Sequence, residues 1–286
     1  MSATSVGASL SSADDSEHGA GGSSPEADGS GSKKKQRRSA AEAFEYYGVF
    51  VAPFIIAGLG LLLFLYYQSL DLPNAKIQLR QTLDWDANLW PQLQRHLYLA
   101  FSATLAVVLI AIPLGVLLTR KAARRYSNGV LAVANGGQAF PAFGLLAVML
   151  VFLGQGPTAV IVALVVYAVL PVLLNTMVGL DGVDESVIEA GRGMGMTRTQ
   201  VLFRIELPLA VPVIIAGLRT AMIITIGTAA LAYIIAGGGL GISISSGLKL
   251  QQDPVIFVSA ALVALVALTF DWIGAIMERL LTPRGV

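Results

Sequence analysis

The sequence predicts an all-α, polytopic membrane protein with six transmembrane helices. Of its 286 residues, 55% are hydrophobic and only 13% are charged, and the mean hydropathy is +0.70. Soluble domains carry about 25% charged residues, so this composition excludes one. Helical spans need roughly 20 apolar residues, and we place them at about 46–68, 96–118, 128–152, 156–179, 210–236 and 254–277.

Residues 1–45 are expected to form a cytoplasmic tail. Up to about residue 43 they are mostly small and polar, so they cannot offset the entropy of ordering, and we expect disorder. The basic run KKKQRR at 33–38 lies too far from the start for a cleavable signal peptide. We interpret it as a topology anchor, because such clusters more often orient a chain and contact anionic lipid than bind nucleic acid.

The rest of the chain divides into two regions. Residues 46–95 comprise the first span and a polar external loop over 69–95, in which Trp90 is a candidate interfacial anchor. Residues 96–280 form the main transmembrane domain, with a tight turn at 154–157 between the third and fourth spans.

Lys and Arg are unevenly distributed across the predicted spans. If the N-terminus is cytoplasmic, the opposite face holds only Lys76, Arg80, Arg95 and Lys249. The cytoplasmic face then holds Lys33, Lys34, Lys35, Arg37, Arg38, Arg120, Lys121, Arg124, Arg125, Arg192, Arg198, Arg204, Arg279 and Arg284. This bias predicts a multi-pass protein of the cytoplasmic membrane with both termini inside.

One long polar segment, residues 181–208, interrupts the apolar half of the chain and must fold at the membrane surface. Ser186 with Glu189, and Thr197 with Gln200, fit two capping boxes, which predicts two short helices. An amphipathic loop resting on lipid headgroups is the plain interpretation. The length and the two caps favour a docking surface for a protein in the cytoplasm.

Small and apolar residues shape this segment. Gly191, Gly193 and Gly195 permit positive φ and close backbone approach, which suits a sharp break between the helices. The apolar side chains that we expect to dock are those of Val187, Ile188, Met194 and Met196.

Several spans contain residues that disrupt helices. The expected breaks lie at Pro113, Pro141, Pro171 and the run 237–241. In lipid, a broken helix is stable only where other helices or a cavity satisfy the freed backbone groups, so these breaks favour a bundle around a pathway. No strand precedes the glycine run, so a bend or outer gate is favoured over a phosphate-binding loop. Its candidate gate residues are Gly238, Gly239 and Gly241.

Arg219 and Asp271 are the ionisable residues deepest in the apolar runs. A charge at that depth is costly and often functional. We hypothesise that Arg219 lines the cytoplasmic side of the pathway, while anchoring or packing is an equally good interpretation.

Other chemistry is not indicated. No GxxxxGK[ST] motif supplies an ATP site, and no chain of intramembrane carboxylates suggests proton coupling. There are no cysteines, and the two histidines, His18 and His96, are far apart in the sequence. We therefore expect no catalytic residues, no metal site and no cofactor.

The polar segment resembles the EAA loop of permease subunits in binding-protein-dependent ABC importers. The resemblance rests on Glu189-Ala190-Gly191, then Gly195, then the run Ile205-Glu206-Leu207-Pro208. Gly191 stands where this family usually has Ala. Over roughly 96–280 the chain is also similar to the glycine betaine, choline and carnitine importers of the osmoprotectant branch, in phrases such as GQAFPAFGLLAVM (137–149) and YAVLPVLLNTMVGLDGVD (167–184).

The resemblance implies a type I ABC importer permease fold and ATP-driven uptake of a quaternary-amine osmoprotectant. It implies separate ATPase subunits, an external substrate-binding protein and a second permease chain, identical or homologous, in the lipid bilayer. The chain itself would not be an enzyme. The residues that would couple it to the ATPase are Val187, Ile188, Glu189, Ala190, Gly191, Met194, Gly195 and Met196.

Three alternatives remain from the sequence. The first is an ABC importer permease for another small solute, such as an amino acid. The second is an ion-driven secondary carrier, against which the missing intramembrane carboxylates count. The third is a membrane scaffold, which would gain nothing from broken helices.

Overall fold

The computed structural model describes residues 29–282, and within this range all regular elements are helices. Residues up to Tyr46 and residues from Tyr47 onward form two separate units. The elements, in chain order, are α1 Gly29–Ser69, η1 Leu72–Asn74, α2 Ile77–Thr82, η2 Trp85–Leu89, α3 Trp90–Thr119, η3 Arg124–Tyr126, α4 Ser127–Ala139, α5 Ala142–Leu153, α6 Pro157–Asp181, α7 Glu185–Gly193, α8 Arg198–Val201, η4 Leu202–Glu206, α9 Leu207–Ala229, η5 Ala232–Ile235, α10 Gly241–Leu250 and α11 Asp253–Leu281.

The first unit is described only from Gly29, where α1 begins. The sequence predicts disorder up to about residue 43, and the structure differs from this over 29–43, where it has a helix. Ala, Lys, Arg, Gln and Glu are good helix formers, and they are frequent just before the apolar run that α1 continues into. The expectation for residues 1–28 lies outside the described residues.

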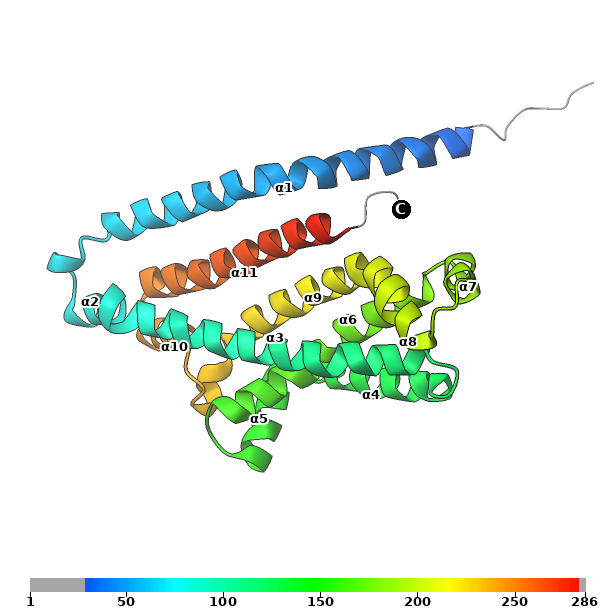
Figure 1. The fold of residues 1–286 in the computed structure, drawn as a ribbon. Coiled ribbons are helices and arrows are strands. Elements are labelled where there is room, and N and C mark those ends of the chain that lie inside the picture. The colour runs from blue at the N-terminus through cyan, green and yellow to red at the C-terminus, as the bar shows by residue number, and fades with distance from the viewer. Residues whose placement is uncertain (1–28, 283–286) are drawn as a thin grey trace, which may run out of the picture. The chain divides into compact units, whose positions relative to one another are not determined.

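The second unit is built on α3, α6 and α9, which run side by side (Figure 1). Two apolar cores hold them together. One core contains Leu99, Ala163 and Ala229, and the other contains Val107, Val172 and Ala221. Small residues at these contacts let the helix backbones approach closely, as in membrane bundles generally.

Among residues 29–282, five helical segments are long and apolar enough to cross a membrane, and a bent pair would make a sixth. The pair replaces the continuous third span expected over 128–152. Helices α4 and α5 meet at an angle of 101°. The cause is Pro141, which lacks an amide hydrogen and forces the preceding Phe140 into an extended conformation, with ψ at 137°.

Two other spans differ from the prediction. The second begins at Trp90, and η1, α2 and η2 occupy much of the expected loop over 69–95. The fifth ends at Ala229, and the remaining apolar run forms η5, whose Ala232 and Ile235 are buried in the core. These apolar residues of η5 are buried in the protein and are not part of a membrane span. Sequence pattern alone cannot distinguish a buried apolar segment from a membrane span.

The tight turn expected before the fourth span is confirmed. Gly154 and Gly156 both have positive φ, at 76° and 121°. The Gly156 amide donates a hydrogen bond of 2.9 Å to the Ile235 carbonyl, which fixes this turn against the end of η5.

Candidate functional site

The polar loop, residues 181–208, contains α7, α8 and η4 and leads directly into α9. Helix α7 begins at Glu185 because the Asp184 carboxylate accepts a 2.8 Å hydrogen bond from the Ser186 amide. The expected cap by Ser186 and Glu189 is therefore wrong. Asp184 is also a strong capping residue, and it starts the helix earlier.

The hydrogen bond to the Ser186 amide lowers the pKa of the Asp184 carboxyl below its ordinary value, because it favours the ionised form. The second capping box is confirmed. The Gln200 amide donates to the Thr197 hydroxyl at 3.3 Å, and the Gln200 side chain accepts from the Thr197 amide at 2.8 Å.

The three glycines of the loop have different roles. Gly195 has a positive φ of 82° and makes the sharp turn after α7. Gly191 is buried, and a Cβ there would lie 2.5 Å from the Ile205 Cδ1 atom. Gly193 has open space around it and no positive φ. Turn geometry thus requires glycine at 195, and close packing favours it at 191.

The expected docking residues divide into two groups. Val187 and Met194 are exposed, at 42% and 73%. Ile188 and Met196 are half-buried and line an open cleft, while Glu189 and Ala190 are exposed. Val187 on α7 and Met194, the residue after α7, thus expose large apolar side chains on a polar segment.

The cleft beside these residues has a volume of about 1350 Å³. It lies between the end of α3, the end of α6 and the polar loop. Its charged lining residues are Arg120, Lys121, Arg124, Asp181, Glu185, Arg192, Arg198 and Glu206.

Sequence reasoning missed an ion pair in this cleft. Arg120 donates to both carboxylate oxygens of Glu206, with an Nη1–Oε1 distance of 3.1 Å. Glu206 is only 4% exposed. The available signal was a glutamate at the start of an apolar run, which needs a cationic partner when it is buried.

Arg219 lies in another ion-pair network. Its guanidinium donates to the Asp271 Oδ1 atom from Nε at 3.0 Å and from Nη2 at 2.8 Å, and from Nη1 to the Glu278 Oε2 atom at 2.8 Å. The network joins α9 to α11. This pairing favours the anchoring role that the sequence left open, and it adds Glu278, which sequence reasoning did not single out.

The glycine-rich turn, residues 236–241, lies beyond the opposite end of α9 from the polar loop. Gly238 and Gly239 have φ values of 91° and 89°. A Cβ at Gly241 would lie 1.8 Å from the Ala230 carbonyl oxygen, so only glycine fits there. The bend that the sequence predicts is confirmed, while the gate remains a proposal.

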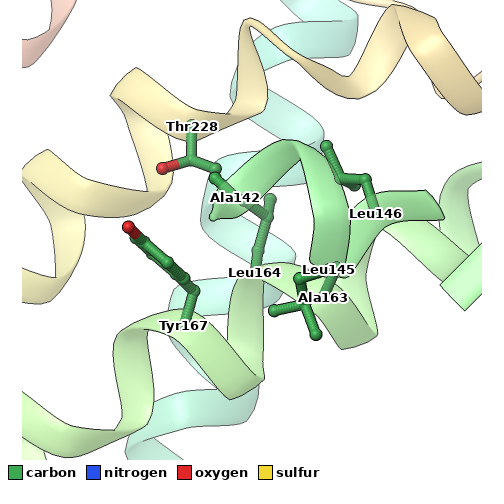
Figure 2. A pocket seen from close by; sticks show the side chains of 7 residues that line it. All are labelled: Ala142, Leu145, Leu146, Ala163, Leu164, Tyr167 and Thr228. Carbon is green, nitrogen blue, oxygen red and sulfur yellow. The ribbon is translucent and has the colours of Figure 1, made fainter. Parts of the chain in front are cut away.

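Tyr167 and Thr228 lie at a small pocket between α5, α6 and α9 (Figure 2). The other lining residues are Ala142, Leu145, Leu146, Ala163 and Leu164, and the pocket leaves no volume for a water molecule. It is therefore a packing site. In the described part of the chain, no group of three or more His, Asp or Glu side chains could hold a metal ion.

Comparison with known families identifies the class of protein. Residues 111–284 match the family of the binding-protein-dependent transport system inner membrane component. The chain belongs to this family. The resemblance of the chain to the permease subunits of binding-protein-dependent importers is thereby confirmed, and the chain is a permease subunit whose ATPase is a separate subunit.

Two relatives illustrate the similarity of the permease to characterised proteins. The glycine betaine/carnitine/choline transport system permease protein OpuCB of Bacillus subtilis is 41% identical over 191 residues, covering 67% of this chain and 87% of OpuCB. The osmoprotectant import permease protein OsmY of Salmonella typhimurium is 40% identical over 193 residues, covering 68% of this chain and 82% of OsmY.

A solved structure supports the permease fold. The inward-facing MetNI methionine ABC transporter matches with a TM-score of 0.61 and 24% identity, covering 68% of this chain and 96% of that chain. At this identity the likeness shows the fold alone. The type I importer permease fold expected from the sequence is confirmed.

Proposed function

We propose that this permease carries a quaternary-amine osmoprotectant, such as glycine betaine, choline or carnitine, across the cytoplasmic membrane into the cell. The observation that carries the proposal is the 38–42% identity to permeases named for these substrates, over about two thirds of the chain. Import of another small solute, such as an amino acid, is the alternative that the experiment below decides.

The polar loop is the proposed docking site for the ATPase. Val187 and Met194 are exposed on it and would enter an apolar groove, while Gly195 sets the turn that presents Met194. Arg192 and Arg198 flank the apolar side chains and would contact acidic groups of the ATPase. Glu189 and Ala190 lie on the exposed part of α7 and would complete the contact surface.

The proposed orientation follows from charge. The polar loop carries Arg192, Arg198 and Arg204, and the α3–α4 connection carries four more cations at 120–125. Segments rich in Lys and Arg stay in the cytoplasm. Both termini are then cytoplasmic, and the glycine-rich turn faces outward, where Gly238, Gly239 and Gly241 would form the external gate.

A second permease chain completes the proposed pathway. Helix α1 shows large apolar side chains at its surface, including Phe54, Leu62 and Phe64 at 78%, 64% and 56% exposed. Lipid and a second copy or homologue of the permease would cover such surfaces. An external binding protein would deliver the substrate to the outward side.

The test is uptake of labelled glycine betaine, choline and carnitine at high osmolarity, in cells with and without the gene. We expect deletion to abolish uptake, the wild-type gene to restore it, and Gly195→Asp not to restore it although the protein still inserts. Unchanged uptake of all three after deletion, in a host lacking other osmolyte importers, would refute the substrate assignment. Loss of amino-acid uptake instead would support the alternative.

A further inference from the structure

We propose that α3 is the mechanical link between the polar loop and the glycine-rich turn, with Arg120 and Gln92 as the positioning residues at its two ends. The link rests on the proposed function, in which the ATPase moves the polar loop and the glycine-rich turn closes the outer side. The contacts of α3 at each end, and its packing between them, carry the inference.

At the polar loop, α3 holds Glu206. Arg120 directly follows the last residue of α3, and its guanidinium donates to both oxygens of the Glu206 carboxylate. Its Nε atom also donates to the Val116 carbonyl at 3.3 Å, which fixes the side chain against its own helix. Two parallel charge-assisted hydrogen bonds set both distance and orientation. Because Glu206 is buried where η4 meets α9, this pair couples the η4 end of the polar loop to α3.

At the other end, three residues on one face of α3 contact the segment around the glycine-rich turn. The Gln92 Oε1 atom accepts from the Ser243 amide at 3.2 Å and from the Ser243 hydroxyl at 2.8 Å. Ser243 lies in the first turn of α10, where amide groups have no partner within the helix. Gln92 therefore caps α10 from a different helix.

Arg95 and His96 add to this contact. The Arg95 Nε atom donates to the Gly237 carbonyl at 3.0 Å, and the His96 Nε2 atom lies 2.9 Å from the Ile226 carbonyl oxygen. The fit is close, because a Cβ at Gly238 would lie 2.8 Å from the Arg95 Cγ atom. Gly238 and Gly239 lie between η5 and α10, outside both helices. The side chains of Arg95 and His96 are the nearest neighbours of these two glycines, so α3 supports the turn from the side.

Between its ends, α3 is packed too tightly to slip. Ala103, Val107 and Ala111 are fully buried against the neighbouring helices. Near the polar loop, a Cβ at Gly115 would lie 2.7 Å from the Thr176 Cγ2 atom of α6. The 30 residues of α3 span about 45 Å at 1.5 Å per residue. Close-packed interiors have low compressibility and transmit strain, and α3 continues unbroken through Pro113, so a shift at Arg120 should reach Gln92.

The test is hydrogen–deuterium exchange in the full permease, assembled with its ATPase and binding protein in lipid nanodiscs. Exchange over residues 233–245 is compared without nucleotide and with ATP and vanadate. In the wild type we expect a nucleotide-dependent change in this segment. Arg120→Met should abolish the change, and the charge-reversed pair Arg120→Glu with Glu206→Arg should restore it.

Two further variants distinguish loss of the proposed link from non-specific destabilisation of the permease. Arg124→Met removes the exposed Arg124–Asp181 ion pair at the same end of the bundle and should keep the wild-type response. Gln92→Met keeps the volume but removes the acceptor, so it should raise exchange over 233–245 even without nucleotide, whereas Gln92→Glu should not. Gln92→Met keeps the test decisive if Arg120→Met fails to assemble.

The link would be overturned if Arg120→Met kept the full nucleotide-dependent change in exchange, or if Arg124→Met lost as much of it as Arg120→Met. It would also be overturned if the wild type showed no such change. Unchanged exchange in Gln92→Met would also overturn it. None of these readouts depends on the substrate. A normal exchange response together with absent osmolyte uptake would refute the substrate assignment and leave the link standing.

Discussion

A Cβ atom at Gly191 would lie 2.5 Å from the Cδ1 atom of Ile205, although alanine is usual at this position of the motif. The Met196 Sδ and Val201 Cγ2 atoms would each lie 3.6 Å from this Cβ atom. These apolar side chains hold α7 against the rest of the polar loop. The Ile205 methyl is the far end of a flexible side chain, so it can rotate away from one added carbon.

Gly191→Ala should therefore be nearly neutral. The added methyl displaces Ile205, but alanine is favoured over glycine inside a helix by about 0.5–1 kcal/mol. We expect the free energy of unfolding to change by less than about 1 kcal/mol and uptake to stay near the wild-type level. Gly191→Leu serves as the contrast, because it cannot fit and should uncouple ATP hydrolysis from uptake. A large loss of uptake in Gly191→Ala would show that Ile205 cannot move.

Gly195→Ala should impair coupling more than Gly193→Ala. Gly195 has a φ of 82°, where a non-glycine residue costs about 1–2 kcal/mol. Gly193 has open space and ordinary helical backbone, so alanine is tolerated there. The measurement is ATP-dependent uptake in proteoliposomes, with hydrolysis recorded in parallel. Equal uptake by the two variants would mean that the turn after α7 adapts without cost to coupling.

Much of the fold could be predicted from local pattern. Apolar runs locate the spans, and the Thr197 capping box is readable because its partners are three residues apart. The sequence marks Pro141 as a helix disruptor, and the structure breaks there. The breaks expected at Pro113 and Pro171 are wrong, because α3 and α6 continue through them. The sequence does not predict the angle of 101° between α4 and α5. Whether a proline bends or ends a helix depends on the neighbouring helices that satisfy the freed backbone groups.

The candidate site was predictable only where its residues are near in sequence. The contact between Arg120 and Glu206 joins residues 86 positions apart. Arg219 and Asp271 were each recognised as unusual, but their pairing depends on how α9 packs on α11. Periodicity predicts the buried face of a helix and carries no information on which helix covers it.

Arg219→Gln should destabilise the permease more than Asp271→Asn. Gly274 makes room for the arginine, since a Cβ there would lie 2.5 Å from the Arg219 Cγ atom. Losing the guanidinium leaves both Asp271 and Glu278 without this partner, whereas Asp271→Asn leaves the pair with Glu278 intact. Hydrogen bonds to charged groups contribute about 1.5–3 kcal/mol each.

The check is the thermal unfolding midpoint in detergent, with uptake by the surviving fraction. Thr220→Ala, which removes only an exposed hydroxyl bonded to its own helix, is the control. A normal midpoint combined with lost uptake in Arg219→Gln would contradict the anchoring role. It would support the hypothesis that Arg219 lines the pathway.

The start of α7 should loosen at acidic pH because of Asp184. The Ser186 amide lowers the pKa of this carboxyl, so the folded loop favours the ionised form. The stabilisation is complete above the unfolded pKa of about 3.9 and is lost as the pH falls through the lower folded value. Amide exchange over residues 185–189, corrected for intrinsic rates, should show constant protection from neutral pH to about pH 5 and decreasing protection below the ordinary Asp range.

Asp184→Asn keeps a capping oxygen that does not titrate, so its protection should not follow this pH dependence. The same acid response in both proteins would place the titrating group elsewhere in the loop.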